Sequence, residues 1–382
     1  MSASRIPPET IAERLERSGV DRRHFLTFCG KLMVIAPMGL AITSKLSPEA
    51  VAATVGAARR PSVIWLHMQD CTGCTETLLR TSQPDLASLI LDVISLDYHE
   101  TVMAASGKDA EAALRDAMDA NDGKFVCVVE GSIPTGNDGK YLYLAGKPGL
   151  QVLQEVTSRA AAVISMGSCA SWGGVPSSGP NPTGATGVDQ LVKNKPVVNI
   201  PGCPPNPYIL LATVLEYATT GKVPALDDQH RPKFAYDRHI HDQCPRRAHF
   251  DGGRFAKQFG DEGHRQGWCL YRLGCKGPVT HASCSTRQFN EVVDAWPIGI
   301  GHPCVGCTEQ HVGFTIPIYD TVEIEHPTPP ETYAAVSPEH KGISPMATGV
   351  AGVIGGALVG AAFIGSRKLD DNGDSSQNDG KE

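Results

Sequence analysis

Six cysteines and one histidine in the second half of the chain are the residues whose types and spacing could do chemistry. Between residues 236 and 308 they stand in the order His241, Cys244, Cys269, Cys275, Cys284, Cys304 and Cys307. Glycine and proline turns surround them, and the segment has little helical or strand periodicity. Such a segment cannot build a large apolar core, so we expect bound metal to hold it together. Soft thiolate ligands favour iron–sulfur clusters or zinc.

The spacing divides these donors into two sets. The first set is the four donors from His241 to Cys275, and the second is the three cysteines from Cys284 to Cys307. A set of three suits a [3Fe–4S] cluster, which lacks one iron corner, and Pro297 lies in the gap before the last cysteine pair. Zinc is the alternative metal, but it prefers closed sets of four ligands and fits the three-cysteine set poorly.

Several neighbours of these donors have two interpretations. His239 is the rival of His241, but the two-residue spacing to the next cysteine places His241 on the same turn as that ligand. The cations Arg246, Arg247 and Lys276 stand beside ligands and could neutralise cluster charge. They could equally be plain surface residues.

Upstream, four short apolar segments predict buried strands at residues 62–66, 125–129, 161–164 and 197–200. Helical patterns at residues 75–80, 110–120 and 150–159 alternate with them. This alternation predicts an α/β domain with a parallel sheet. In such a sheet, sites form beyond the carboxyl ends of the strands.

Four more cysteines follow these predicted strands directly. They are Cys71, Cys74, Cys169 and Cys203. Because parallel strands end at one edge of the sheet, we expect the four sulfurs to converge and hold one cluster. Cys127 lies inside a strand, so we interpret it as a buried structural thiol.

Composition limits the classes of function. The chain has 382 residues, enough for about two domains and tails. Its net charge of −7 argues against nucleic-acid binding. The twelve cysteines cluster in closely spaced pairs and short loops, which favours metal binding over disulfides.

The two ends of the chain predict export and membrane attachment. Within residues 1–58, the run Arg22-Arg23-His24-Phe25-Leu26 is typical of a twin-arginine signal, with an ordinary amphipathic helix as the alternative. Residues 346–366 carry no charge and are long enough for a transmembrane helix, with a flexible Gly/Ala-rich tail as the alternative. The basic residues that follow place the tail, residues 367–382, in the cytoplasm.

At this point the motifs resemble a known family. They are Cys71-Thr-Gly-Cys74-Thr-Glu-Thr, Glu130-Gly-Ser-Ile-Pro134, Gly167-Ser-Cys169-Ala-Ser-Trp, Pro201-Gly-Cys203-Pro-Pro, His241-Asp-Gln-Cys244, Gly267-Trp-Cys269 and Gly301-His-Pro-Cys304-Val-Gly-Cys307. From about residue 60 to residue 315, the chain resembles the small, iron–sulfur subunit of membrane-bound, periplasm-facing [NiFe] hydrogenases.

The resemblance implies a flavodoxin-like domain at residues 59–230 and an iron–sulfur domain at residues 231–320. The Pro- and Glu-containing composition of residues 321–345 predicts a linker. The resemblance implies two [4Fe–4S] clusters and one [3Fe–4S] cluster. Their ligands would be Cys71, Cys74, Cys169 and Cys203 for the proximal [4Fe–4S], Cys284, Cys304 and Cys307 for the medial [3Fe–4S], and His241, Cys244, Cys269 and Cys275 for the distal [4Fe–4S].

The resemblance also implies partners and a location. The catalytic nickel–iron centre would belong to a separate large subunit, in a heterodimer or a dimer of heterodimers, so this chain has no catalytic residue of its own. Electrons from H2 would leave through a membrane cytochrome b, or another iron–sulfur or quinone-reactive partner, to the quinone pool. The complex would face the periplasm from the inner membrane. Oxygen-tolerant relatives carry two extra cysteines, where this chain has Gly73 and Gly174.

Two other interpretations stay open. A cluster subunit of a complex I-type quinone reductase would share the first domain but lack the second cysteine block. A zinc-stabilised protein of the cell envelope would contain no iron.

Overall fold

A computed structural model describes residues 10–17, 23, 25–27, 29–30, 48–81, 92–288 and 292–324. The predicted transmembrane segment at 346–366, the tail at 367–382 and most of the linker lie outside these residues, as does Arg22 of the predicted signal. Within the described ranges, no helix is long and apolar enough to cross a membrane.

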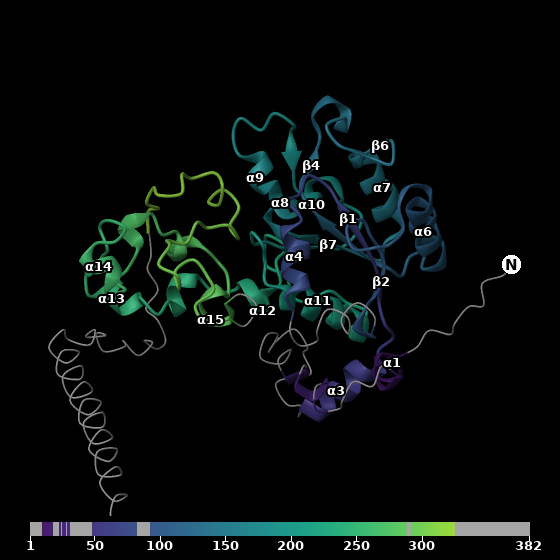
Figure 1. The fold of residues 1–382 in the computed structure, drawn as a ribbon, viewed down its shortest axis with the longest axis horizontal. Helices are drawn as coiled ribbons and strands as arrows, with labels where there is room; N and C mark the ends of the chain where they lie inside the picture. The colour runs from purple at the N-terminus through teal and green to yellow at the C-terminus, as the bar shows by residue number, and fades with distance from the viewer. Residues whose placement is uncertain are drawn as a thin grey trace, which may run out of the picture. The chain divides into compact units, whose positions relative to one another are not determined.

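The first domain is built on a five-stranded parallel sheet with the strand order β2-β1-β3-β7-β9 (Figure 1). The strands are β1 (Ser62–His67), β2 (Ser95–His99), β3 (Val126–Glu130), β7 (Ala162–Met166) and β9 (Val197–Ile200). The four predicted strands are confirmed. β2 is an addition to them, because its sequence at this edge of the sheet includes polar residues and lacks a continuous apolar run.

Two apolar layers cover the sheet, because successive side chains of each strand point to opposite faces. On one face, Trp65 and Val128 pack with helix α11 (Pro207–Thr220). On the other face, Ile64 and Val129 pack with residues of α6 (Gly107–Ala120) and α7 (Gly149–Arg159). Both strand faces are therefore buried, which explains the continuous apolar runs of the sequence.

Shorter elements complete the first domain. The helices are α4 (Gly73–Leu79), α8 (Gly167–Trp172), α9 (Gly174–Ser177), α10 (Val188–Leu191) and the 3-10 turn η3 (Gly136–Gly139). Two small antiparallel pairs join β4 (Ile133–Pro134) to β8 (Ala185–Thr186), and β5 (Tyr143–Leu144) to β6 (Lys147–Pro148). α4 and α8 matter most for the site, because each begins just after a central strand.

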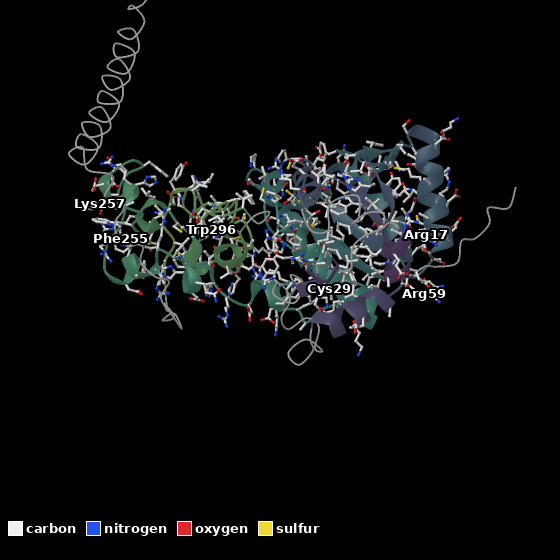
Figure 2. All side chains as sticks on the ribbon, turned by 60° about the horizontal axis from the view of Figure 1, so that its bottom comes forward. Arg17, Cys29, Arg59, Phe255, Lys257 and Trp296 are labelled. Atoms are coloured by element: carbon white, nitrogen blue, oxygen red, sulfur yellow. The ribbon has the colours of Figure 1, made fainter. Side chains whose placement is uncertain are left out.

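The described N-terminal residues pack on the first domain. Helices α1 (Ile11–Arg17) and α3 (Pro48–Ala57) contribute to the same core as α11, with Ile11 and Cys29 fully buried. The amide of Ile11 donates to the carbonyl of Ala58 at 3.0 Å. Figure 2 labels Arg17 and Arg59 near one end of the molecule and Cys29 nearer to its middle. Residues of the predicted signal region therefore cover part of the core in this structure.

The second domain is made of short helices and loops. They are α12 (Lys233–Tyr236), η4 (Ile240–Gln243), α13 (Arg247–Asp251), α14 (Glu262–Arg265), η5 (Tyr271–Leu273), η6 (Gly277–Val279) and α15 (Cys284–Arg287). Its core is small and mixes apolar residues such as Ile240, Leu270 and Trp296 with cysteines. The loop-rich character expected from the sequence is thus present in the described residues.

A buried ion pair joins the two domains. The Arg231 guanidinium lies 2.7 Å from an Asp227 carboxylate oxygen and 2.9 Å from Glu309, and it donates to the Thr308 carbonyl at 3.0 Å. Glu309 also accepts from the His281 amide at 3.0 Å. Burial alone would raise the pKa of Glu309, but hydrogen bonds from His281 and the charge of Arg231 outweigh it and lower the pKa to about 2.

We predict that Arg231→Met destabilises the chain strongly. Removing the cation leaves the buried Glu309 and the partly buried Asp227 without their arginine, and breaking a buried ion pair typically costs about 3–5 kcal/mol. Arg265→Met is the matched control, because Arg265 pairs with Glu262 at 3.1 Å and both side chains are 64% exposed. Its loss should cost about 0–1 kcal/mol. Urea unfolding of the two variants beside the wild type measures the difference, and equal effects would contradict the role of the buried pair.

Candidate metal-binding sites

The first candidate site lies at the carboxyl ends of three sheet strands. Cys71 and Cys74 follow β1, Cys169 lies in α8 directly after β7, and Cys203 follows β9. The thiol of Cys74 has its pKa raised by burial first, then by Glu130 and by the charges of the other three cysteines of this set. The structure therefore brings together the four sulfurs that the sequence predicts. Cys71 and Cys203 are exposed, so this site opens at the surface of the chain.

Glu130, the last residue of β3, fixes the start of α4 beneath this site. One carboxylate oxygen accepts from the Cys74 amide at 2.9 Å, and the other accepts from the Thr75 hydroxyl at 2.6 Å. The Trp65 indole N–H donates to Glu130 at 3.2 Å. The sequence marks Glu130 only as part of a motif. The only local signal that Glu130 is buried is its position as a single acidic residue at the end of an apolar strand.

Glycines keep the space beside these sulfurs open. A Cβ at Gly174 would lie 2.7 Å from the sulfur of Cys169, and one at Gly73 would lie 3.1 Å from the sulfur of Cys71. Gly174 also has a φ of +53°, which disfavours other residues. Gly73 and Gly174, the positions at which we expect oxygen-tolerant relatives to carry extra cysteines, are therefore adjacent to the first site.

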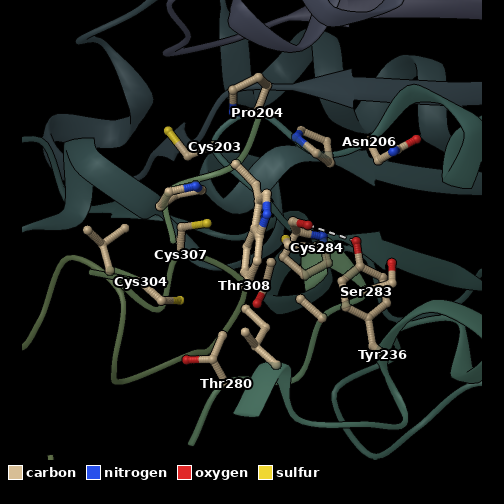
Figure 3. A pocket seen from close by; sticks show the side chains of 18 of the residues that line it. Cys203, Pro204, Asn206, Tyr236, Thr280, Ser283, Cys284, Cys304, Cys307 and Thr308 are labelled. Carbon is tan, nitrogen blue, oxygen red and sulfur yellow. Dashed lines mark hydrogen bonds between the residues drawn. The ribbon is translucent and has the colours of Figure 1, made fainter. Parts of the chain in front are cut away.

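The second candidate site is a largely apolar cavity between the two domains (Figure 3). Cys284, Cys304 and Cys307 line it, and Trp296 and Pro297 form part of its wall. Burial raises the pKa of the Cys284 thiol to about 11 and, together with the charge of Cys284, that of Cys307 to about 12. Pro297 thus stands beside the three cysteines, where it provides no sulfur.

The third candidate site is a smaller cavity lined by His241, Cys244, Cys269 and Cys275. Burial first, and the charge of Arg247 second, lower the pKa of His241 to about 4, so its imidazole is neutral at pH 7. Its Nε2 is buried and has no hydrogen-bond partner among the described residues. A neutral imidazole with an unpartnered nitrogen beside three thiols fits a metal ligand set.

His239 does not line this cavity. Its ring instead packs on His281 with centroids 3.9 Å apart, and its Nδ1 lies 3.8 Å from Asp242. The geometry therefore favours His241 over its rival. The remaining cysteines, Cys29 and Cys127, are buried in the apolar layers of the first domain, and all twelve cysteines are unpaired.

Contacts connect the first site to the second and the second to the third. Cys203 of the first site also lines the cavity of the second, and the Ser168 hydroxyl donates to the Cys307 carbonyl at 2.5 Å. At the other end, the Lys276 amide donates to the Cys304 carbonyl at 2.8 Å, and Lys276 directly follows Cys275 of the third site. The second site is therefore the neighbour of both others.

The cations beside the ligands are not plain surface residues. Lys276 is fully buried, and Arg247 is buried and paired with Asp251 at 3.0 Å. Arg246 is partly covered and donates to the Trp268 carbonyl at 3.0 Å. The surface interpretation is wrong for Lys276 and Arg247, because both are buried. Lys276 is enclosed by carbonyls of residues 317–320, which the local sequence could not place beside it.

Two family models match separate parts of the chain. Residues 71–217 match the family described as NADH ubiquinone oxidoreductase, 20 Kd subunit. Residues 236–319 match the family of the C-terminal part of the NiFe/NiFeSe hydrogenase small subunit. The first match covers the sheet domain except β1 and the last residues of that domain, and the second covers most of the loop-rich domain.

Similar proteins span nearly the whole chain. The Hydrogenase-2 small chain of Escherichia coli is 47% identical over 352 residues, which cover 92% of this chain and 93% of that protein. The first periplasmic [NiFe] hydrogenase small subunit of Nitratidesulfovibrio vulgaris is 48% identical over 303 residues, covering 79% and 93%. A solved structure of the Dm. baculatum [NiFeSe]-hydrogenase matches with a TM-score of 0.64 and 32% identity, covering 69% of this chain and all of that one.

Both domains, in one chain and in the same order, have counterparts in these relatives. A resemblance confined to the sheet domain would have left the complex I-type interpretation equally good. The matched second domain decides between them, and the chain belongs to the family of [NiFe] hydrogenase small subunits.

Proposed function

We propose that this chain is the electron-relay subunit of a [NiFe] hydrogenase that oxidises H2 and delivers the electrons to a membrane acceptor. The observation that carries the proposal is the row of three sulfur sites, each neighbouring the next. When bound, iron–sulfur clusters supply one-electron oxidation and reduction. The nickel–iron centre would be held by a separate large subunit.

The ligand sets follow the three sites. Cys71, Cys74, Cys169 and Cys203 would hold the proximal [4Fe–4S] cluster. Cys284, Cys304 and Cys307 would hold the medial [3Fe–4S] cluster. His241, Cys244, Cys269 and Cys275 would hold the distal [4Fe–4S] cluster. Pro297 in the wall of the second cavity supports three ligands there, because it offers no donor to a fourth iron.

The chain's own residues protect and orient these sites. The second and third sites are largely covered by the chain, since Cys304, Cys244 and Cys269 are less than 9% exposed and Cys284 and Cys307 are half-buried. The first site is different, because Cys71 and Cys203 are exposed in this chain. We infer that this opening is closed in the heterodimer by the large partner, which would bring its nickel–iron centre next to the proximal cluster.

The acceptor and location extend the proposal to the ends of the chain. The Wolinella succinogenes relative, 45% identical over 297 residues, is named a quinone-reactive hydrogenase small chain. We propose export by the twin-arginine signal within residues 1–58, domains at 59–230 and 231–320, and a linker at 321–345. The anchor at 346–366 would then hold the complex on the periplasmic side of the inner membrane, beside a cytochrome b or another quinone-reactive partner.

We predict that Cys307→Ala removes one cluster and leaves the others. The purified heterodimer should lose about 3 of the roughly 11 iron atoms that two [4Fe–4S] and one [3Fe–4S] clusters contain, together with the [3Fe–4S] signal in electron paramagnetic resonance. Cys127→Ala is the control, because Cys127 is buried in the sheet away from the sites. Zinc in place of iron in the wild type would contradict the assignment.

We predict that Cys244→Ala blocks the exit of electrons but not the splitting of hydrogen. Cys244 belongs to the third site, whereas the reaction with H2 would take place beyond the first. H2-dependent dye reduction should fall about tenfold or more, while hydrogen isotope exchange by the same heterodimer should persist. Equal losses of both activities would overturn the order of the relay.

We predict that air inactivates the enzyme. Gly73 and Gly174 lie beside the sulfurs of the first site, so the two positions add no further sulfur to the proximal cluster. The test is the H2 oxidation current of the purified complex while oxygen is admitted. A current sustained in air would show that oxygen tolerance has another origin in this chain.

A further inference from the structure

We propose that two buried charges of opposite sign, Glu130 and Lys276, create a fixed electrostatic gradient along the relay. Glu130 lies against the first site and Lys276 lies between the second and third. The anion should lower the reduction potential of the proximal cluster, and the cation should raise the potentials of the medial and distal clusters. Electrons would then be driven from the first site toward the third. This inference rests on the cluster positions proposed above.

The surroundings of Glu130 identify it as an ionised carboxylate. Its side chain is almost fully buried, and the groups that contact its oxygens are donors: two backbone amides, the Thr75 hydroxyl and the Trp65 indole. An ionised carboxylate only accepts hydrogen bonds, so this set of donors matches its charged form. One of those amides belongs to Cys74, a ligand of the first site, so the charge lies directly beside the proximal cluster.

The nearest cation does not cancel this charge. His67 Nδ1 lies 4.0 Å from Glu130, but it is hydrogen-bonded to the closer Asp70. The other ring nitrogen faces His99 Nδ1 at 3.4 Å. A protonated His67 would be balanced by Asp70, and a neutral His67 would balance nothing. In either case Glu130 keeps one negative charge.

Lys276 is surrounded by hydrogen-bond acceptors, whereas Glu130 is surrounded by donors. Its side chain is fully buried, and its Nζ donates to the carbonyls of Pro317 at 2.9 Å and Ile318 at 2.8 Å, with Gly274 and Asp320 each at 3.3 Å. Only carbonyl oxygens surround the amine, which suits an ammonium that carries donors alone. Burial lowers the pKa of Lys276, and the charges of Cys304, Cys275 and Asp320 act against this and favour the ammonium.

Two other buried cations of this region are balanced by carboxylates. Arg231 pairs with Asp227 and Glu309, and Arg247 pairs with Asp251. Lys276 therefore contributes a net charge that those groups do not. The charge of Lys276 interacts with Cys304 of the second site and with Cys275 of the third, so both sites experience it.

These two charges should affect the reduction potentials because they are buried. Charges exposed to water are screened within about 10 Å at ordinary salt, whereas buried charges are screened much less. Net charge and hydrogen bonding are among the factors that set the potential of an iron–sulfur cluster. Adding an electron is harder next to an anion and easier next to a cation, so opposite charges at opposite ends favour one direction of transfer.

The test is a redox titration of the loaded heterodimer, followed by electron paramagnetic resonance. Glu130→Gln should raise the proximal potential, and Lys276→Gln should lower the medial and distal potentials. The amide of glutamine keeps a donor for the carbonyls around Lys276. Glu262→Gln and Lys257→Gln are the matched controls, since both residues are exposed, and Lys257 lies at the outer edge of the second domain (Figure 2). The controls should change no potential.

The opposite signs separate an electrostatic role from simple loosening of the structure. Unchanged potentials in loaded variants, or shifts of both variants in the same direction, would overturn the gradient. Lys276→Met is the second variant. If both Lys276 variants lose the medial and distal signals, the lysine has a structural role only, and the proposal is overturned. Absence of iron–sulfur signals from the wild type would instead reject the proposed function, before any variant is compared.

Discussion

The packing of sulfur atoms into cavities, in place of an apolar core, is the constraint on which the second domain depends. Its described helices are short, and cysteines such as Cys244, Cys275 and Cys304 belong to the small cluster that serves as its core. Burial raises the pKa of thiols such as Cys244 and Cys269 to about 12, so without metal they would be protonated. Metal binding then releases the thiol protons and forms metal–sulfur bonds that connect distant loops, so that metal binding becomes part of folding.

The first domain solves a different problem with regular structure. Its parallel sheet brings the ends of β1, β7 and β9 to one edge, and the cysteines that follow these strands meet there. Glu130 supports this arrangement by binding the amides at the start of α4. The first site is thus positioned by topology, whereas the other two are positioned by local turns. The ion pairs of Arg231 with Asp227 and Glu309 join the two domains that hold these sites.

Much of this could be predicted from the sequence, because the signals are local. Apolar runs identify the strands β1, β3, β7 and β9. Cysteine spacing indicates two of the candidate ligand sets, and the positions after the predicted strands indicate the third. The edge strand β2 escapes prediction because Asp97 and its polar neighbours interrupt the apolar pattern. The packing of Ile11 and Cys29 on the core also escapes, because it depends on contacts with residues far along the chain.

The roles of charged residues are the least predictable, and Lys276 shows why. A lysine between Cys275 and Gly277 gives no local sign of burial, since its four carbonyl partners include three from residues 317–320. A buried charge without an ionic partner is normally costly, and carbonyl dipoles offset only part of that cost. A negatively charged cluster on either side would supply the missing counter-charge. The segment around residue 318 should therefore be held most firmly when the neighbouring sites are loaded, so that the same cation links metal binding, folding and the direction of electron flow.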